Sequence, residues 1–193
     1  MTFFKDNSYT IVKMMLYQFG MTLMGMITAL AAVSSKNNSL LLLVSLYAAG
    51  LYLVLLYMMT WDLGGKDHIR ADAGIITGDR FSGLKLSLWA NLPNFIVFLC
   101  IAVGYIFGEA IGAAPWAQAM FGIAHTVGLV TQSMYYGIIE LLIPSATTAA
   151  TSGAYLVAYA LTPLPAIATC TFGYLMGYHD RRIFGFMGQK NSK

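Results

Sequence analysis

The chain has 193 residues, of which 58% are hydrophobic and only 10% are charged, with a net charge of +3. A soluble domain carries roughly 25% charged residues, so this composition excludes an ordinary soluble globular protein. The charges gather in short polar segments, which indicates membrane orientation and argues against a nucleic-acid partner. We therefore expect a single transmembrane domain over residues 1–193, surrounded by membrane lipid.

The first two apolar segments, 14–34 and 40–61, each have the length of a transmembrane helix. At about 1.5 Å per residue, each can cross a hydrocarbon core of about 30 Å. The "ALA" at 29–31 resembles a signal-peptide cleavage site, but the apolar run continues to Ser34. We expect the first segment to be retained as an uncleaved span.

Residues 61–85 contain eight of the nineteen charged residues of the chain. Acidic and basic side chains alternate there, so we expect them to form short local pairs. Glycines at 64, 65, 74, 78 and 83 predict turns, and hence a structured polar loop over 62–85. The loop is also a candidate partner-docking surface, with these residues as candidates: Asp62, Lys66, Asp67, Arg70, Asp72, Asp79 and Arg80.

The third apolar segment, 86–107, contains Pro93 close to its beginning. Proline removes a backbone donor and clashes with the preceding turn, so a bend is expected there. Phe81, Leu84 and Leu88 have helical spacing, which predicts that the loop leads into an amphipathic helix on the membrane surface.

The fourth segment, 117–143, has two faces when drawn as one continuous helix. Its apolar face could place it on the membrane surface, but its polar face carries no Lys or Arg, which a surface helix would usually have. We favour a polar face that meets protein or a cavity. That face extends over about 33 Å and holds Gln118, His125, Gln132 and Glu140.

The fifth segment, 154–178, is interrupted by "TPLP" at 162–165, which predicts a kinked or broken helix. A carbonyl one turn before each proline would lose its donor and could face the polar side of the fourth segment, which we call the polar stripe. We therefore hypothesise a binding pocket in which His125, Gln132 and Glu140 lie beside Thr162. The alternative for Glu140 is a solvated position at the outer interface.

The distribution of Lys and Arg predicts the orientation of the chain. If all five segments cross, these residues divide six to five between the two sides. If the fourth or fifth fails to cross, ten of the eleven share the side of the termini and only Lys36 lies opposite. We therefore expect both termini and the loop 62–85 in the cytoplasm, with the protein in the cell membrane.

No motif points to a cofactor, a metal or a catalytic set. Cys100 and Cys170 lie in apolar runs without ligands at metal spacing, so we expect both to be free and buried. The aspartates of 62–85 lack the spacing of phospho-alcohol transferases. The "GGKD" at 64–67 lacks the upstream glycine and the hydroxyl residue of a phosphate loop.

The predicted fold is an all-α polytopic bundle with four full transmembrane helices and one partial, kinked or interfacial element. The predicted function is that of a non-enzymatic subunit or accessory partner of a larger membrane complex, docking through 62–85. The partner is another protein or further copies of this chain. The alternative is a small transporter or solute-binding subunit with a polar pocket between segments four and five.

Overall fold

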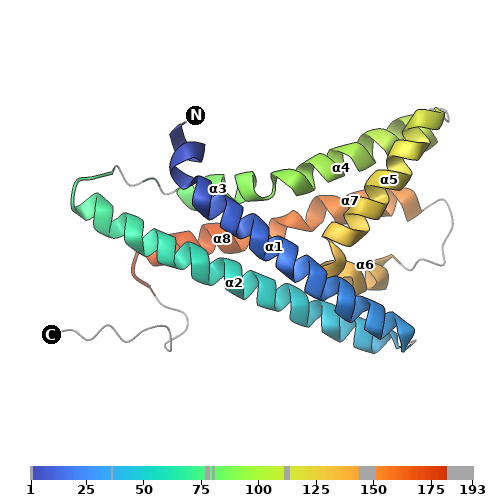
Figure 1. Cartoon of the computed structure of the whole chain (residues 1–193), viewed down its shortest axis with the longest axis horizontal. Helices are drawn as coiled ribbons and strands as arrows, with labels where there is room; N and C mark the ends of the chain where they lie inside the picture. Colours follow the sequence, from blue (N-terminus) through green and yellow to red (C-terminus); the bar gives the residue numbers. More distant parts are fainter. Residues whose placement is uncertain are drawn as a thin grey trace.

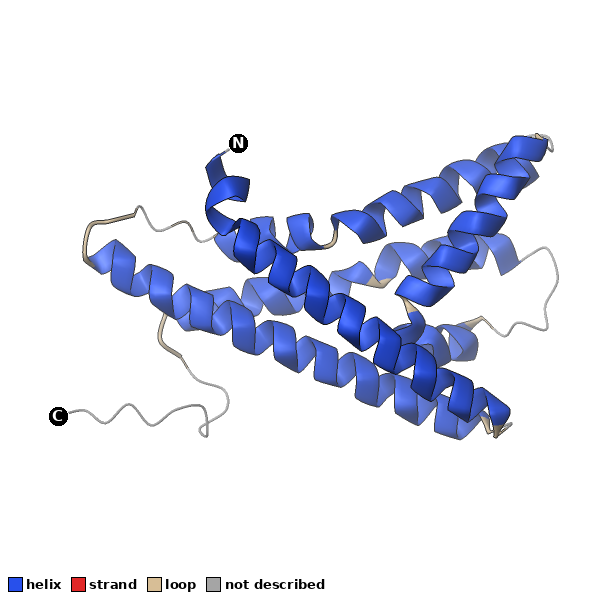
Figure 2. Cartoon of the chain, in the orientation of Figure 1, coloured by secondary structure: helices blue, strands red, loops and turns tan. Residues whose placement is uncertain are grey.

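The computed structural model describes residues 2–35, 37–76, 79, 81–110, 114–143 and 151–181, and within these residues it is helical without strands (Figure 2). Two short irregular turns, a π-helical turn η1 and a 3₁₀ turn η2, interrupt the α-helices. In chain order the elements are α1 Thr2–Ser34, α2 Asn38–Asp72, α3 Ser82–Ala90, α4 Leu92–Tyr105, η1 Ile106–Ala110, α5 Pro115–Thr131, η2 Ser133–Tyr135, α6 Tyr136–Leu142, α7 Thr151–Leu161 and α8 Pro163–Tyr178.

Helices α1, α2, α3 and α8 pack together into a unit that we call the bundle (Figure 1). Glycines allow its backbones to meet without intervening side chains. Gly64 of α2 faces the carbonyl oxygen of Tyr174, and Gly177 of α8 faces that of Trp61. Close backbone approach through small residues is the usual way in which helices associate in a membrane.

The charged segment does not form the loop that its glycines predict. Helix α2 continues to Asp72, and Gly64 and Gly65 are helical. The prediction was wrong because Gly64 serves helix packing and not a turn. Gly74 does form a turn, with φ of +69°, just after α2 ends.

The third segment is bent, as Pro93 predicts. Helices α3 and α4 meet at Asn91 with an angle of 55° between them. Pro93 lies in the first turn of α4, where its missing N–H costs nothing. Asn91 is buried and its amide donates to the carbonyl of Ser87. The helix expected before the third segment forms as α3 and packs against α1 and α8.

The fourth segment is not one helix, which contradicts the prediction for 117–143. Helix α5 ends at Thr131, and a 3₁₀ turn separates it from the short α6. Hydroxyls tie this break to α1: Thr22 donates to the carbonyl of Thr131 at 3.1 Å, and Ser133 donates to that of Thr22 at 2.7 Å. Side-chain partners of this kind make irregular backbone tolerable inside a membrane.

The fifth segment is divided at Thr162 into α7 and α8, as its prolines predict. Pro163 cannot donate to the carbonyl of Tyr159, one turn earlier. The Thr162 hydroxyl donates to that carbonyl instead, at 3.1 Å, and the Thr162 N–H keeps its helical bond to Ala158. The interruption is therefore confined to one residue, and the two helices continue as one candidate span over 153–178.

Within the part of the chain that the structure describes, three helices are long and apolar enough to cross a membrane, namely 7–34, 38–72 and 153–178. The bent pair formed by α3 and α4 makes a fourth if it counts as one span. The fourth sequence segment is not among these candidates. The ring of Phe4 in α1 packs against that of Trp89 in α3, so the chain begins at the charged end of the bundle. The indole N–H of Trp61 donates to the carbonyl of Arg181, so α8 ends there as well.

Helices α4 and α5 form a second unit, which we call the arm. They project from the bundle and meet at the end of the molecule that lies far from the charged residues (Figure 1). Gly104 of α4 lies against the backbone of Phe121, where an added Cβ would come within 2.7 Å of the nitrogen. The arm is therefore a tightly packed pair.

Candidate functional site

The charged end of the molecule, residues 62–85, pairs its own charges. Lys66 bonds to Asp62 and Lys85 to Asp79, and His68 lies 3.4 Å from Asp72. Arg70 approaches Asp67 at 3.9 Å. These contacts confirm the expected local pairing, while Arg80 lies outside the described residues.

Asp67 links the charged end to α8. It is mostly buried, and the phenol of Tyr174 donates to its carboxylate at 3.0 Å. Tyr174 is itself buried and lies against Gly64 and Gly83 from two neighbouring helices. Asp67 is thus a structural residue that fixes the end of α2 to the bundle.

Apolar side chains at the charged end point outward. Four of them, with exposed fractions from 37% to 73%, form what we call the tip patch: Ile69, Ile75, Ile76 and Phe81. In sequence they lie on both sides of the turn after α2, among the paired charges. A contiguous exposed apolar patch with a polar rim marks an interaction site.

His125 lies in a cluster of aromatic rings between α5 and α7. Its imidazole is 5.1 Å from the ring of Tyr155, 6.0 Å from that of Tyr159 and 5.7 Å from that of Phe121, measured between centroids. The hydroxyl of Tyr159 is buried and has no hydrogen-bond partner among the described residues. The structure therefore brings His125 to the fifth segment, as the pocket hypothesis requires.

Thr162 and Glu140 approach the same cluster from other sides. Thr162 is bonded to the backbone of Tyr159. The carboxylate of Glu140 is close enough to Tyr136 and Tyr155 for direct electrostatic interaction.

Glu140 also lies beside the beginning of α2, with Asn38 and Leu41 in the walls of a small pocket of about 160 Å³. The beginning of a helix favours a nearby negative charge. This placement gives Glu140 a structural reason to be where it is.

The two glutamines of the predicted stripe do not share a face. Gln118 is exposed, and its amide reaches the carbonyl of Gly108 inside the arm at 3.4 Å. Gln132 is buried at the break after α5. The stripe was wrong because it assumed one continuous helix through Gln132.

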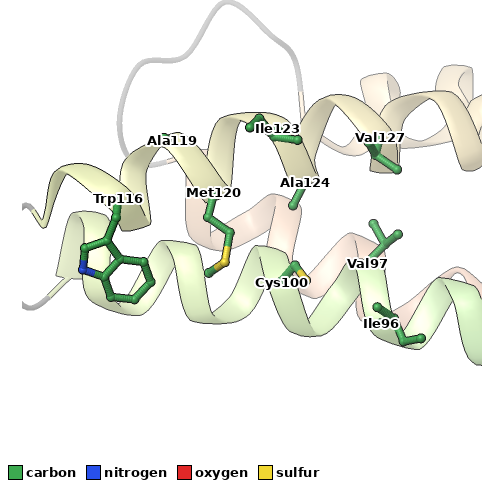
Figure 3. Close-up of a pocket in the computed structure, with 9 residues that line it drawn as sticks. All are labelled: Ile96, Val97, Cys100, Trp116, Ala119, Met120, Ile123, Ala124 and Val127. Carbon is green, nitrogen blue, oxygen red and sulfur yellow. The ribbon is translucent and has the colours of Figure 1, made fainter.

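A groove of about 540 Å³ runs between α4 and α5 (Figure 3). Trp116 lies at one end and Val127 at the other. Apart from the thiol of Cys100 and the indole N–H of Trp116, its lining side chains are apolar, which suits lipid chains better than a polar solute. The lining residues are Ile96, Val97, Cys100, Trp116, Ala119, Met120, Ile123, Ala124 and Val127.

Several residues of the interior were not predicted as site residues. Asn91 and Asn94 are buried at the α3–α4 bend, and Tyr159 and Tyr174 are buried at the two ends of the fifth segment. The "NLPN" at 91–94, two amides around a proline within an apolar run, was the signal for the first pair. Aromatic residues within an apolar segment give no such signal.

The described residues hold no group of three or more His, Cys, Asp or Glu side chains that could bind a metal. Cys100 is half-buried and Cys170 is fully buried, both as free thiols. Compared with protein-family models, with curated proteins and with solved structures, the chain matches none of them.

Proposed function

We propose that this protein is a non-enzymatic subunit or accessory partner of a larger membrane complex and docks through its charged end. In this proposal α1, α2, the bent pair α3–α4 and the helix α7–α8 cross the membrane. The element α5–α6 enters it and returns. Both termini and the charged end then lie in the cytoplasm, where ten of the eleven Lys and Arg residues would be found.

The length of α2 supports a surface beyond the membrane. Its 35 residues extend over about 52 Å, whereas a hydrocarbon core is about 30 Å thick. The Asp, Lys, Arg and His residues of α2 are all in its last eleven positions, 62–72, so this end is the one that projects. The tip patch is at the end of that projection.

The tip patch is the observation that carries the proposal. The neighbouring charges satisfy one another, so they need no partner, whereas the isoleucines remain exposed beyond the span. Burying one such side chain contributes about 1.5–3 kcal/mol. A protein with a complementary apolar surface is the partner that this chemistry fits.

Purification from native membranes in mild detergent tests the proposal. We expect wild-type protein to retain a stoichiometric protein partner, or to form a defined oligomer, and we expect Ile75→Glu to lose it. The matched control is Lys66→Gln, which changes an exposed residue of the same end without touching the patch. Retention of the partner by Ile75→Glu, or a monomeric wild-type protein without partner, would contradict docking through the patch.

The aromatic cluster at His125 favours one second candidate function, that of a transporter or solute-binding subunit. His125 contacts Tyr155 and Tyr159 of α7, Glu140 interacts electrostatically with Tyr155, and Thr162 follows on the same segment. Gln132 is buried at the end of α5. Under this alternative, Glu140→Ala and Gln132→Leu abolish solute uptake while the protein still folds. Bound small-molecule density in a purified sample would support it, and unchanged function in both variants would reject it.

A further inference from the structure

The arm enters and leaves the rest of the molecule at two irregular points. At one base, Asn91 separates α3 from α4, with φ of −89° and ψ of 5°. At the other base, Gln132 ends α5, with φ of −108° and ψ of 16°. Residues at the ends of elements absorb the dihedral changes of hinge motion, and a 3₁₀ stretch within a helix often marks a hinge.

The arm itself is rigid. Gly104 and Gly108 bring α4 against α5, and the Phe107 and Trp116 rings stack near its far end at 6.1 Å. Gln118 bonds across to Gly108. Any displacement therefore moves α4 and α5 together.

We call the contact between the arm and α7 the seam. It differs from the contacts within the arm. Rings make up the seam between α5 and α7, with His125 of the arm against Tyr155 and Tyr159. Ile101 of α4 packs on Tyr159 in the same cluster.

No hydrogen bond crosses the seam between the described residues of the arm and α7, and the Tyr159 hydroxyl is enclosed there without a partner. A buried polar group without a partner is unfavourable, but the Tyr135 hydroxyl in the main core is enclosed in the same way. The seam is therefore distinguished by the lack of hydrogen bonds between its two sides, whereas Asp67 and Tyr174 join α2 to α8 by such a bond.

We propose that the arm is a lid that pivots at Asn91 and at Gln132 and opens the seam. Opening uncovers the hydroxyl of Tyr159, the imidazole of His125 and the side chain of Gln132. The pivots stay in place because Asn91 is bonded to Ser87 and the break at Gln132 is tied to Thr22 of the bundle. This inference does not depend on docking at the charged end, which is at the other end of the molecule from the arm (Figure 1).

Thiol labelling in the membrane tests the lid. In a chain whose Cys100 and Cys170 are replaced by alanine, a single cysteine replaces either Tyr159 or Tyr52. Both tyrosines are 3% exposed, but Tyr52 lies inside the bundle. We expect N-ethylmaleimide to label position 159 about tenfold faster, because local opening exposes a seam more often than a core.

A loosening variant sharpens the test. His125→Ala removes the ring that bridges α5 and α7, so we expect it to accelerate labelling at 159 further and to leave labelling at 52 unchanged. Equal rates at 159 and 52, or no response at 159 to His125→Ala, would overturn the lid.

A second pair of single-cysteine variants, made at smaller side chains, tests the lid if Tyr159→Cys does not fold. Ala124→Cys probes the seam and Ala49→Cys the bundle, at two buried alanines with nearly equal exposure, 7% and 6%. Faster labelling at 124 than at 49 supports the lid. Equal rates would overturn it.

Discussion

The bundle and the arm are both packed through glycine, but they join the molecule in different ways. In the bundle, Gly64 and Gly177 place the backbones of α2 and α8 directly against each other. In the arm, Gly104 and Gly108 do the same for α4 and α5. Between the arm and α7, by contrast, aromatic rings make the contact, with His125 against Tyr155 and with Tyr159 against the glycine backbone at Gly128. We expect a contact made through rings to open more readily than one in which two backbones meet directly.

The largest expected effect comes from filling a bundle contact. Gly64→Ala places a methyl group against the Tyr174 carbonyl, which cannot move aside, and we expect a loss of about 3 kcal/mol in unfolding free energy. Gly50→Ala is the control on the same helix, because nothing lies within 4 Å of its added Cβ. We expect it to change stability by less than about 1 kcal/mol and in the favourable direction.

Unfolding in mixed micelles, followed by circular dichroism, measures both variants. If Gly64→Ala were as stable as Gly50→Ala, the close packing of α2 on α8 would be wrong. The claim that direct backbone contacts fix the helices of the bundle would then be wrong.

A smaller loss is expected at the charged end of the bundle. Tyr174→Phe removes the donor to the partly buried carboxylate of Asp67. Hydrogen bonds to charged groups contribute about 1.5–3 kcal/mol, so we expect a loss of about 2 kcal/mol. Tyr47→Phe, on an exposed part of α2, is the control and should be neutral. Equal midpoints for the two variants would show that Asp67 does not tie α2 to α8.

Two threonines of the fifth segment separate a necessary hydrogen bond from a redundant one. Thr162 and Thr171 both donate a hydroxyl hydrogen to a carbonyl of the preceding turn. Only the carbonyl bonded by Thr162 lacks a backbone donor, because Pro163 follows. We expect Thr162→Val to cost about 1 kcal/mol and Thr171→Val to be close to neutral. The same unfolding assay measures both variants. Identical losses would show that the Thr162 hydroxyl does not replace the donor lost at Pro163.

The smallest effect concerns the turn after α2. Hydrogen bonds from Lys85 and from the Phe81 N–H lower the pKa of the Asp79 carboxyl. A lowered pKa in the folded state contributes stability above the unfolded pKa of about 3.9, and this contribution disappears as the pH falls below it.

For this exposed pair the contribution is at most about 1 kcal/mol. Asp79→Asn should therefore lower stability slightly at pH 7 and make it less dependent on pH between about 5 and 3. Parallel pH profiles of wild type and variant would contradict the pairing with Lys85.

The sequence was sufficient for the helical class, for the bend at Pro93 and for the local pairing of Asp62 with Lys66. These features depend on composition or on neighbours within one helical turn. The break at Gln132 could not be predicted in the same way, because no proline or glycine occurs there and its hydrogen bonds come from Thr22, far away in the chain. The interruption at Thr162 was predicted from Pro163, but the hydroxyl bond that replaces the lost donor was not.

The candidate site shows the same limit. The helical spacing of His125 and Gln132 suggested a shared face, but only tertiary structure could show which rings surround His125. The role of Gly64 also changed, from a turn to a helix contact, once Tyr174 was found opposite it. Residue types at a site were thus predictable, whereas their partners from other helices were not.

Pulsed electron paramagnetic resonance in lipid nanodiscs tests the difference between bundle and arm most directly. One pair of spin labels, at the exposed Ile123 of α5 and Val157 of α7, spans the seam; the other, at the exposed Leu46 of α2 and Phe172 of α8, lies within the bundle. The account predicts two distances or a broad distribution for the first pair and a single narrow distance for the second. A single narrow distance for both pairs would contradict it.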